Sequence, residues 1–399
     1  MVPEGWSKAS LGDVVNYKKG FAFDSSDYSE NGVRVIRISD TTRDGLHSNN
    51  PKYVAEDRAD GFSDWQLFGG DIIVSTVGSR PHLLDSMVGK AVRIPANFKG
   101  SLLNQNLVKL APKKDRVISE ILYPHLKDNR FITFISGLVR GNANQVSITL
   151  KELFTFPILL PPLPEQQKIA DILSTWDQAI EKTEALLSNA RTQKRALMQQ
   201  LLTGKRRFPV FEGQPWNSGK LVDHFDFING RAFKPDDWGD VGFPIIRIQN
   251  LTGSTDAINY YDGVVDEKHT IRSGDFLLSW SATLDTFIWT GPVAVLNQHI
   301  FKVVPKSDTL KMFGFHLITH EIGKLVSKVH GTSMKHITKK DLAKIESFFP
   351  SLAEQEKITE TLDDADRFVN DVQADLTKLR TEKKALMQQL LTGKRRVVV

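Results

Sequence analysis

Two polar segments of similar type, one in each half of the chain, carry residues suited to contacts with nucleic acid. Residues 140–145 read ArgGlyAsnAlaAsnGln, and residues 331–336 read GlyThrSerMetLysHis. Asn and Gln side chains can bind the edge of adenine with two hydrogen bonds, and Arg or Lys can bind guanine. Glycine lets backbone N–H groups approach a phosphate. These residue types therefore indicate binding chemistry.

Other basic, amide and aromatic side chains extend this pattern over both halves. The candidates for DNA contact are Lys18, Lys19, Arg37, Arg80, Arg140, Asn142, Asn144 and Gln145, then Arg231, Lys234, Arg247, Gln249, Trp280, Thr332, Ser333, Lys335 and His336. The alternative for each is a merely solvated surface side chain, which is the commoner case. Asn104 and Gln105 recur as Asn297 and Gln298, so a structural role explains them equally well.

Motifs of catalytic and nucleotide-binding chains are absent from the sequence. There is no GlyxxxxGlyLys[Ser/Thr] loop, no HisGluxxHis helix and no GlyxSerxGly elbow. The pair Pro161–Pro162 lacks the flanking residues of an amino-methyltransferase motif. A nuclease-like string, Pro235–Asp236 with Asp266–Glu267–Lys268, is short, and its counterpart at 54–58 lacks the lysine. A reader without a catalytic set is the favoured interpretation.

Composition narrows the class further. The 399 residues are 40% hydrophobic and 25% charged, as in globular proteins, and the net charge of +5 mildly favours an anionic partner. The absence of cysteine excludes disulfides, thiolate catalysis and Cys-ligated zinc, and the ten histidines show no metal-ligand spacing. Without a long apolar run or a signal segment, we expect no membrane contact and a cytoplasmic location.

The sequence is a tandem duplication. The string AlaLeuMetGlnGlnLeuLeuThrGlyLysArgArg occurs at 196–207 and again at 385–396, a separation of 385 − 196 = 189 positions. The match extends back to LeuProGluGlnGlnLysIle at 163–169 and LeuAlaGluGlnGluLysIle at 352–358. We therefore expect a globular domain at 1–160, a helix at 161–207, a second globular domain at 208–350 and a second helix at 351–399.

Each duplicated segment predicts one long helix. Residues 165–203 contain no glycine or proline, and Pro164 and Gly204 flank them as start and stop signals. Apolar residues recur at steps of four and three from Ile169 to Leu201, and the same stripe runs from Ile358 to Leu390. At 1.5 Å per residue such a helix is roughly 58 Å long and outruns its own domain. An antiparallel coiled coil with pseudo-two-fold symmetry is therefore favoured over two amphipathic helices that each lie on one domain.

The two helices end in identical basic segments. Positive charge at a helix C-terminus complements the helix dipole, and this explains the segments as well as docking does. The docking interpretation rests on the twelve-residue identity, which exceeds what capping requires. Its candidate residues are Leu197, Gln200, Leu201, Leu386, Gln389 and Leu390.

The two globular domains have diverged but keep landmarks in order. Gly20 corresponds to Gly230, and Leu103–Asn104–Gln105 corresponds to Leu296–Asn297–Gln298. β-Branched runs predict strands at 33–38, 72–77, 88–94 and 106–110, then 245–248, 276–280, 293–296 and 300–304, with helices near 119–136 and 311–329. Each domain is therefore predicted to be α/β or α+β, followed by its long helix.

This organisation resembles the specificity subunit of type I restriction-modification systems. The resemblance covers the whole chain, and LeuProProLeuProGluGlnGlnLysIle at 160–169 is its most family-like string, whereas the second copy loses two prolines. It implies that the globular domains are target-recognition domains, each reading half of an asymmetric, split DNA sequence, and that the helices act as spacer and docking platform. Two modification subunits with S-adenosylmethionine, and a restriction subunit driven by ATP and Mg, are the implied partners, while this chain holds no cofactor.

Two other classes stay open from the residues alone. One is a self-contained enzyme that modifies or cleaves DNA, which would show turnover without partners. The other is a coiled-coil scaffold that binds only protein, which would show no sequence-dependent DNA affinity.

Overall fold

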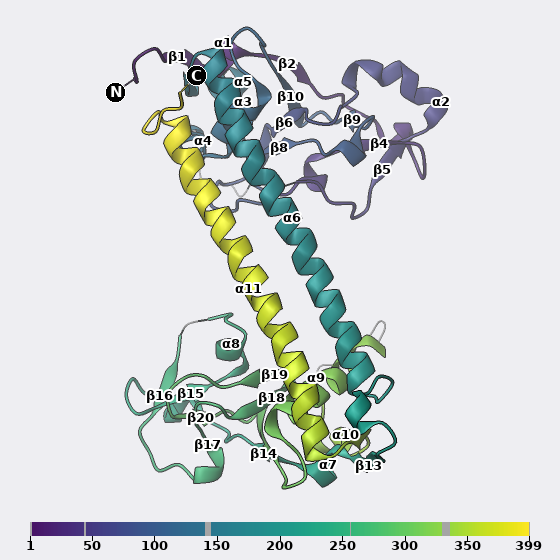
Figure 1. Ribbon diagram of the computed structural model, residues 1–399. Helices are drawn as coiled ribbons and strands as arrows, with labels where there is room; N and C mark the ends of the chain where they lie inside the picture. The colour runs from purple at the N-terminus through teal and green to yellow at the C-terminus, as the bar shows by residue number, and fades with distance from the viewer. Residues whose placement is uncertain (1, 44, 140–144, 256, 329–335, 399) are drawn as a thin grey trace. The chain divides into compact units, whose positions relative to one another are not determined.

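The computed structural model describes residues 2–43, 45–139, 145–255, 257–328 and 336–398. It divides into two compact units, one made of Met1–Lys182 and Leu376–Val399, the other of Thr183–Asp375 (Figure 1). Each unit therefore combines one globular domain with parts of both long helices. Among the described helices, none is long and apolar enough to cross a membrane.

The globular domain of unit 1 contains two four-stranded sheets. The first is antiparallel in the order β2-β10-β6-β8, with bounds Val15–Lys19, Leu107–Pro112, Ile72–Ser75 and Ala91–Arg93. The second has the order β3-β5-β4-β9, with bounds Tyr28–Ser29, Lys52–Val54, Val33–Ile36 and Leu102–Leu103. Two short pairs complete the sheets: β1 (Ser7–Ser10) with β12 (Pro157–Leu160), and β7 (Val77–Ser79) with β11 (Gln145–Ser147).

Unit 2 repeats this plan. Its sheets have the orders β14-β21-β18-β19 (Phe225–Asn229, Ile300–Pro305, Phe276–Ser281, Thr283–Ile288) and β16-β15-β20-β17 (Asn259–Tyr261, Phe243–Ile246, Ala294–Leu296, Thr270–Ile271). The pair β13 (Asn217–Lys220) with β22 (Glu346–Phe349) corresponds to β1 with β12. In both units a parallel pairing joins the second sheet, β4 with β9 and β15 with β20. The predicted duplication of the globular domain is confirmed.

Helices cover these sheets. Unit 1 has α3 (Ser119–Lys127) and α4 (Asn129–Leu138), and unit 2 has α9 (Lys311–Lys328). Helical structure near 119–136 is confirmed, but it breaks at Asp128, whose side chain accepts a hydrogen bond from the Arg130 backbone N–H and caps α4. The short helices are α1 (Leu11–Val14), α2 (Glu56–Ala59), α5 (Leu150–Leu153), α7 (Leu221–His224), α8 (Ile248–Leu251) and α10 (Lys339–Leu342).

Several predicted strand boundaries are wrong. The strands expected to reach Ile38 and Ile248 end two residues earlier, at Ile36 and Ile246, because the 3₁₀ helix η2 (Ile38–Asp40) and α8 begin there. The carboxylate of Asp40 and the amide of Asn250 accept the backbone N–H of Arg37 and Arg247, respectively, and thereby fix these starts. The strand expected from residue 88 begins at Ala91, after Gly89 with φ +75°.

A shared glycine explains one sequence landmark. A Cβ atom on Gly20 would lie 1.9 Å from the Asn104 carbonyl oxygen, and one on Gly230 would lie 2.2 Å from that of Asn297. Only glycine permits this backbone approach. The glycine landmark that the two domains share is therefore structural.

The long helices α6 (Leu163–Leu201) and α11 (Leu352–Leu391) pack together antiparallel in each unit. The ammonium of Lys383 pairs with Asp177 in unit 1, and Lys194 pairs with Asp366 in unit 2. These pairs are equivalent, since both partners are shifted by 189 positions. The predicted stripe is the buried face, for example at Ile169, Leu187, Leu362 and Leu390. The coiled-coil prediction is confirmed.

A buried carboxylate holds the beginning of each long helix to the end of the other. In unit 1, Arg396 donates two hydrogen bonds to Glu165 at 2.8 and 2.9 Å, and Trp6 Nε1 donates a third at 3.0 Å. In unit 2, Arg207 donates to Glu354 at 2.9 and 2.6 Å, and Trp216 Nε1 donates at 2.9 Å. The last arginine of each repeat therefore has an internal partner.

The glutamine after each carboxylate ties the helix to its own globular domain. Gln166 accepts the Ile118 N–H at 3.1 Å and donates to the Arg116 and Pro161 carbonyls at 2.9 Å. Gln355 accepts the Leu310 N–H at 2.8 Å and donates to the Asp308 and Pro350 carbonyls at 2.9 Å. Both side chains are buried, so the repeated GluGln dipeptide has a structural cause.

Removing one buried carboxylate should destabilise the chain. We expect Glu165→Ala to lower the free energy of unfolding by about 2 kcal/mol, because the buried Trp6 N–H and the Arg396 guanidinium lose a charged acceptor. Glu181→Ala, on an exposed position of α6, is the control and should change it by less than about 0.5 kcal/mol. Urea unfolding followed by circular dichroism compares them, and equal midpoints would contradict a stabilising role for this carboxylate.

Candidate nucleic-acid interface

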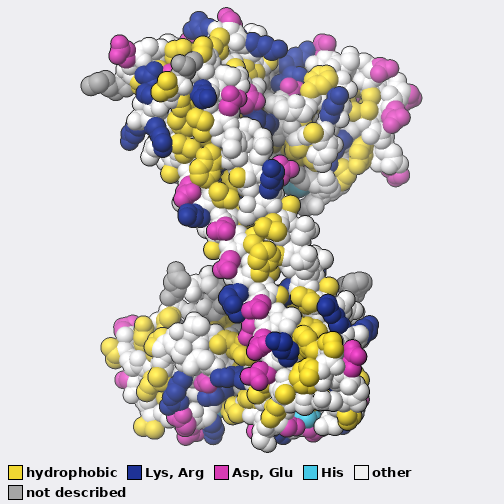
Figure 2. All heavy atoms as spheres, viewed as in Figure 1, with side chains coloured by type: hydrophobic (Ala, Val, Ile, Leu, Met, Phe, Trp, Pro, Cys, Tyr) yellow, Lys and Arg dark blue, Asp and Glu magenta, His cyan; other side chains and the backbone are white. Residues whose placement is uncertain are grey.

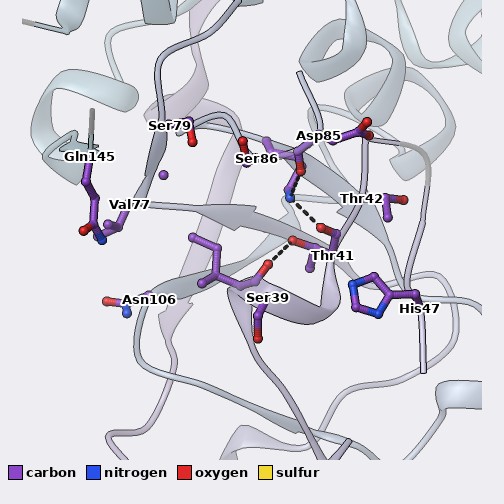
Figure 3. Close-up of a pocket in the computed structure, with 13 residues that line it drawn as sticks. Ser39, Thr41, Thr42, His47, Val77, Ser79, Asp85, Ser86, Asn106 and Gln145 are labelled. Carbon is purple, nitrogen blue, oxygen red and sulfur yellow. Dashed lines mark hydrogen bonds between the residues drawn. The ribbon is translucent and has the colours of Figure 1, made fainter. Parts of the chain in front are cut away.

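In unit 1 the sheet extension β7 meets β11 beside two predicted contact residues. Antiparallel pairing places Gln145 opposite Ser79, the residue before Arg80. The Gln145 side chain is exposed, and Arg80 is half-buried. Figure 3 shows Gln145, Val77 and Ser79 along the same side of a cavity. The structure thus brings together Gln145 and the neighbourhood of Arg80, which are 65 positions apart in sequence (145 − 80).

Unit 2 uses the equivalent place. Ser281 at the end of β18 bridges His336, and the Ile337 N–H donates to the Trp280 carbonyl at 2.8 Å. The Trp280 ring lies 5.3 Å from the His299 ring, and its Nε1 donates to the Gln298 carbonyl at 3.1 Å. Trp280 and His336 therefore lie at one sheet end, and His336 is exposed.

Six predicted contact residues lie outside the described residues. They are Arg140, Asn142, Asn144, Thr332, Ser333 and Lys335.

Three predicted arginines are held by partners inside the chain. Arg37 forms a two-pronged ion pair with the buried Asp40, and this hydrogen-bonded pairing raises its pKa. Arg231 lies 4.4 Å above the Tyr261 ring and 3.4 Å from Asp237. Arg247 donates to Asn259 at 2.8 Å and lies above a tryptophan ring. These three arginines stabilise their loops, so a base contact by them requires exchange of partners.

The remaining candidates are more accessible. Lys18 is 40% exposed, pairs with Asp64 at 3.0 Å and lies 4.7 Å from the Trp65 ring centre. Lys19, Lys234 and Gln249 are exposed. Of the predicted set in the described part of the chain, these side chains and those of Gln145 and His336 are the more available to a ligand.

Sequence reasoning missed a cavity of about 620 Å³ in unit 1 that has both polar and apolar lining residues (Figure 3). It is lined by residues of η2, β7, β11 and the segments 41–47 and 85–90, and by Asn106; they include Ser39, Thr41, Asp85, Ser86 and Lys90. Lys90 is only 4% exposed, and its ammonium donates to the Thr41 carbonyl at 2.6 Å and to the Asp85 carbonyl. Burial, with Lys127 adding to it and Asp85 opposing it, lowers the Lys90 pKa to about 8. No motif in the sequence predicts that this lysine is buried. Its position directly after Gly89 is a weak indication of a turn there.

The nuclease-like residues of unit 2 pair locally. Lys268 lies 3.1 Å from Asp266, and Glu267 forms an ion pair with Arg272. Their charges are thus used in surface pairs on one short turn.

One group in unit 2 has a composition suited to a metal ion. His316 is buried and lies 2.7 Å from Asp363 and 3.8 Å from Asp366. Burial lowers the His316 pKa, although both carboxylates oppose this effect. Because Lys194 already pairs with Asp366, an internal cation neutralises part of the acidic charge. We therefore interpret the group as a contact between α9 and α11.

The predicted docking residues separate by burial. Leu201 and Leu390 are 2% and 1% exposed and belong to the cores of their units, so they cannot meet a partner in this structure. Leu197 and Leu386 are half-buried, and Gln200 and Gln389 are exposed. In unit 1, Gln389 lines a groove of about 460 Å³ between α4 and the end of α11, with Asp128, Arg130, Gln388, Thr392 and Lys394.

Comparison with known proteins agrees with this architecture. The family model for the type I restriction modification DNA specificity domain matches residues 3–188 and 213–379. The type I restriction enzyme MjaVIII specificity subunit of Methanocaldococcus jannaschii is 24% identical over 444 residues, covering 99% of this chain and 94% of its own.

Solved structures show the same fold. A chain from a study of complex assembly and conformational transition of the type I R-M system has a TM-score of 0.61 and 17% identity, covering 99% of this chain and 100% of its own. The type I S subunit from M. genitalium has a TM-score of 0.56 and 15% identity, covering 98% and 96%. Because the family model matches most of both halves, the chain belongs to the type I restriction-modification DNA specificity family and is a DNA-recognition subunit, not a catalytic one.

Proposed function

We propose that this chain directs methylation and restriction to an asymmetric, two-part DNA target. Residues 1–160 and 208–350 act as target-recognition domains that each read one half-site, and residues 161–207 and 351–399 act as spacer helices. The proposal is supported by the repetition of the same sheets and long helix in both units, with different loops between the strands. β6 continues through β7 into the segment 80–90, whereas β18 returns at once into β19 through Ala282 with φ +59°.

DNA contact is proposed at the sheet ends that carry Gln145 and His336. Both side chains are exposed. Gln145 pairs with β7, the extension of β6, and His336 bridges the last residue of β18. Amide, imidazole and hydroxyl groups there offer donors and acceptors to base edges. Lys18, Lys19, Lys234 and Gln249, with Arg80, would add backbone or base contacts nearby, and the six candidates outside the described residues stay in the proposal.

The helix ends are proposed to dock partner subunits. Gln200 and Gln389, with the half-buried Leu197 and Leu386, form two equivalent surfaces, which suits two modification subunits. S-Adenosylmethionine would be bound by those subunits, and ATP and Mg by a restriction subunit. Since the target is genomic DNA, the complex would act in the cytoplasm.

Exchange of one globular domain tests the assignment directly. Replacing residues 1–150 with the matching domain of a relative should change one half of the methylated sequence and leave the other, because the repeated frame holds the domains independently. Methylome sequencing of cells carrying the chimera measures this. A change in both halves, in a complex that still assembles, would argue against independent reading.

Single side chains at the two sheet ends should affect separate half-sites. We expect Gln145→Ala and His336→Ala each to weaken specific binding of the assembled complex by about 1–3 kcal/mol if a base contact is lost. Competition binding with duplexes altered in one half-site assigns each effect to a half. Gln178→Ala, exposed on α6, is the control. Full target affinity in both variants would move the readers elsewhere.

The helices should set the gap between half-sites. One heptad inserted after Thr183 and one after Val372 preserve the stripe and add about 10.5 Å. At about 3.4 Å per base pair, the gap should grow by roughly three base pairs. After insertion in one helix only, the Lys194–Asp366 and Lys383–Asp177 pairs could not both stay in register, and assembly should be impaired. An active double variant that still methylates the original spacing would show that the globular domains fix it.

A further inference from the structure

The cavity of unit 1 has the chemistry of a ligand site. Its volume of about 620 Å³ lies in the range of small-molecule pockets. Thr41, Thr42 and His47 line one side, and Val77, Ser79 and Gln145 line the opposite side (Figure 3). The walls come from segments far apart in sequence, so the cavity exists only in the folded domain.

A buried cation reaches this cavity with one donor to spare. The Lys90 ammonium has three N–H donors, and the described residues provide two acceptors, the carbonyls of Thr41 and Asp85. These two bonds fix the direction of the third N–H. A side chain that is 96% buried and incompletely bonded is costly unless a ligand or water completes it.

The cavity wall itself is built by a close backbone approach. A Cβ atom on Gly78 would lie 2.6 Å from the Ser86 carbonyl oxygen, and the Ser79 N–H donates to that oxygen at 2.7 Å. This contact holds the segment that carries Asp85 and Lys90 against β7. The position of the buried lysine is therefore set by the main chain.

We propose that this cavity binds a nucleobase, with the Lys90 ammonium donating to a ring nitrogen or a carbonyl oxygen of the base. Asn106 and Gln145 offer amide donors and acceptors, and Asp85 can accept from an exocyclic amino group. Ile38 and Val77 supply apolar surface for a ring face. Mixed donors and acceptors around one apolar slot suit a base.

Other ligand classes fit less well. A phosphate would meet one lining lysine together with the carboxylate of Asp85, which repels an anion. An added peptide strand would need an open edge of β7, but β11 pairs with one edge, and Met87 forms a bridge with Ser79 at the other. A base still stacked in a duplex presents only its edge, which is poorly placed to reach a nearly buried ammonium, so a DNA base would enter unstacked.

The site belongs to one half of the molecule. In unit 2, β18 turns directly into β19, so no segment corresponds to 80–90 and no lysine corresponds to Lys90. With DNA as the source, a base of only one half-site would be held. Binding of a DNA base in this cavity rests on the proposed function, whereas binding of a free nucleoside does not.

Fluorescence of 2-aminopurine tests the proposal in the complex with modification subunits. The probe replaces single bases along the half-site assigned to residues 1–150, and the free 2-aminopurine nucleoside is titrated separately. We expect one duplex position to brighten several-fold on binding, because unstacking relieves quenching. Ser86→Trp, which fills the cavity from an exposed rim position, should abolish the signal and weaken specific affinity at least about 10-fold.

Two further variants show whether a loss of signal is specific to the cavity. Ser25→Trp adds the same bulk on exposed η1 (Ser25–Asp27) and should retain the signal. Lys90→Met, which keeps an unbranched chain, should also lose it. Binding of the free nucleoside without any brightened duplex position would assign the site to a free nucleoside or nucleobase. The proposal would be overturned if the complex bound DNA specifically but showed neither a brightened duplex position nor nucleoside binding. Signals that are unchanged in Ser86→Trp would also overturn it. If the unmodified complex did not bind DNA specifically, that result would instead count against the proposed function.

Discussion

The rest of the structure depends on the ion pair between the buried carboxylate at the start of each long helix and the arginine that follows the other helix. Glu165 and Glu354 are almost fully buried, so each must be paired to persist as an anion. Burial raises the pKa of Glu165, but hydrogen bonds from Arg396 and Trp6 outweigh this and keep the pKa below its usual value. One anion thereby joins the start of one helix, the end of the other and the first strand region of a globular domain.

This closure explains why the helix ends are the least changed parts of the duplication. The last arginine of each repeat binds the buried glutamate at the start of the other helix, and the glutamine after that glutamate binds the globular domain. A change in any of these residues would leave a buried polar group without its partner. The loops at the sheet ends take no part in this helix closure. They can change length, as 80–90 and the turn at Ala282 show, while the frame stays the same.

The sequence predicted the features that follow from periodicity or repetition. The heptad stripe gave both helices and their buried faces, and the landmarks gave two equivalent domains. It did not predict that Arg207 and Arg396 bind inside the chain, because their partners lie 147 and 231 positions away. Lys90 was missed for the same reason: its burial results from η2, β7 and β11 meeting around it. Arg37 and Arg247 looked like base readers, but a neighbouring Asp40 or Asn259 holds each of them.

The two units also differ where a globular domain meets the paired helices. Asp177 and Lys383 line an open cavity of about 510 Å³ in unit 1, whereas their equivalents Asp366 and Lys194 lie beside the buried His316 in unit 2. The same ion pair thus supports two different surroundings. The ion pairs and the helix ends are equivalent in the two units, whereas the surroundings of the ion pairs and the loops proposed to read DNA differ. The paired helices can therefore carry two globular domains with different surfaces while their own contacts stay the same.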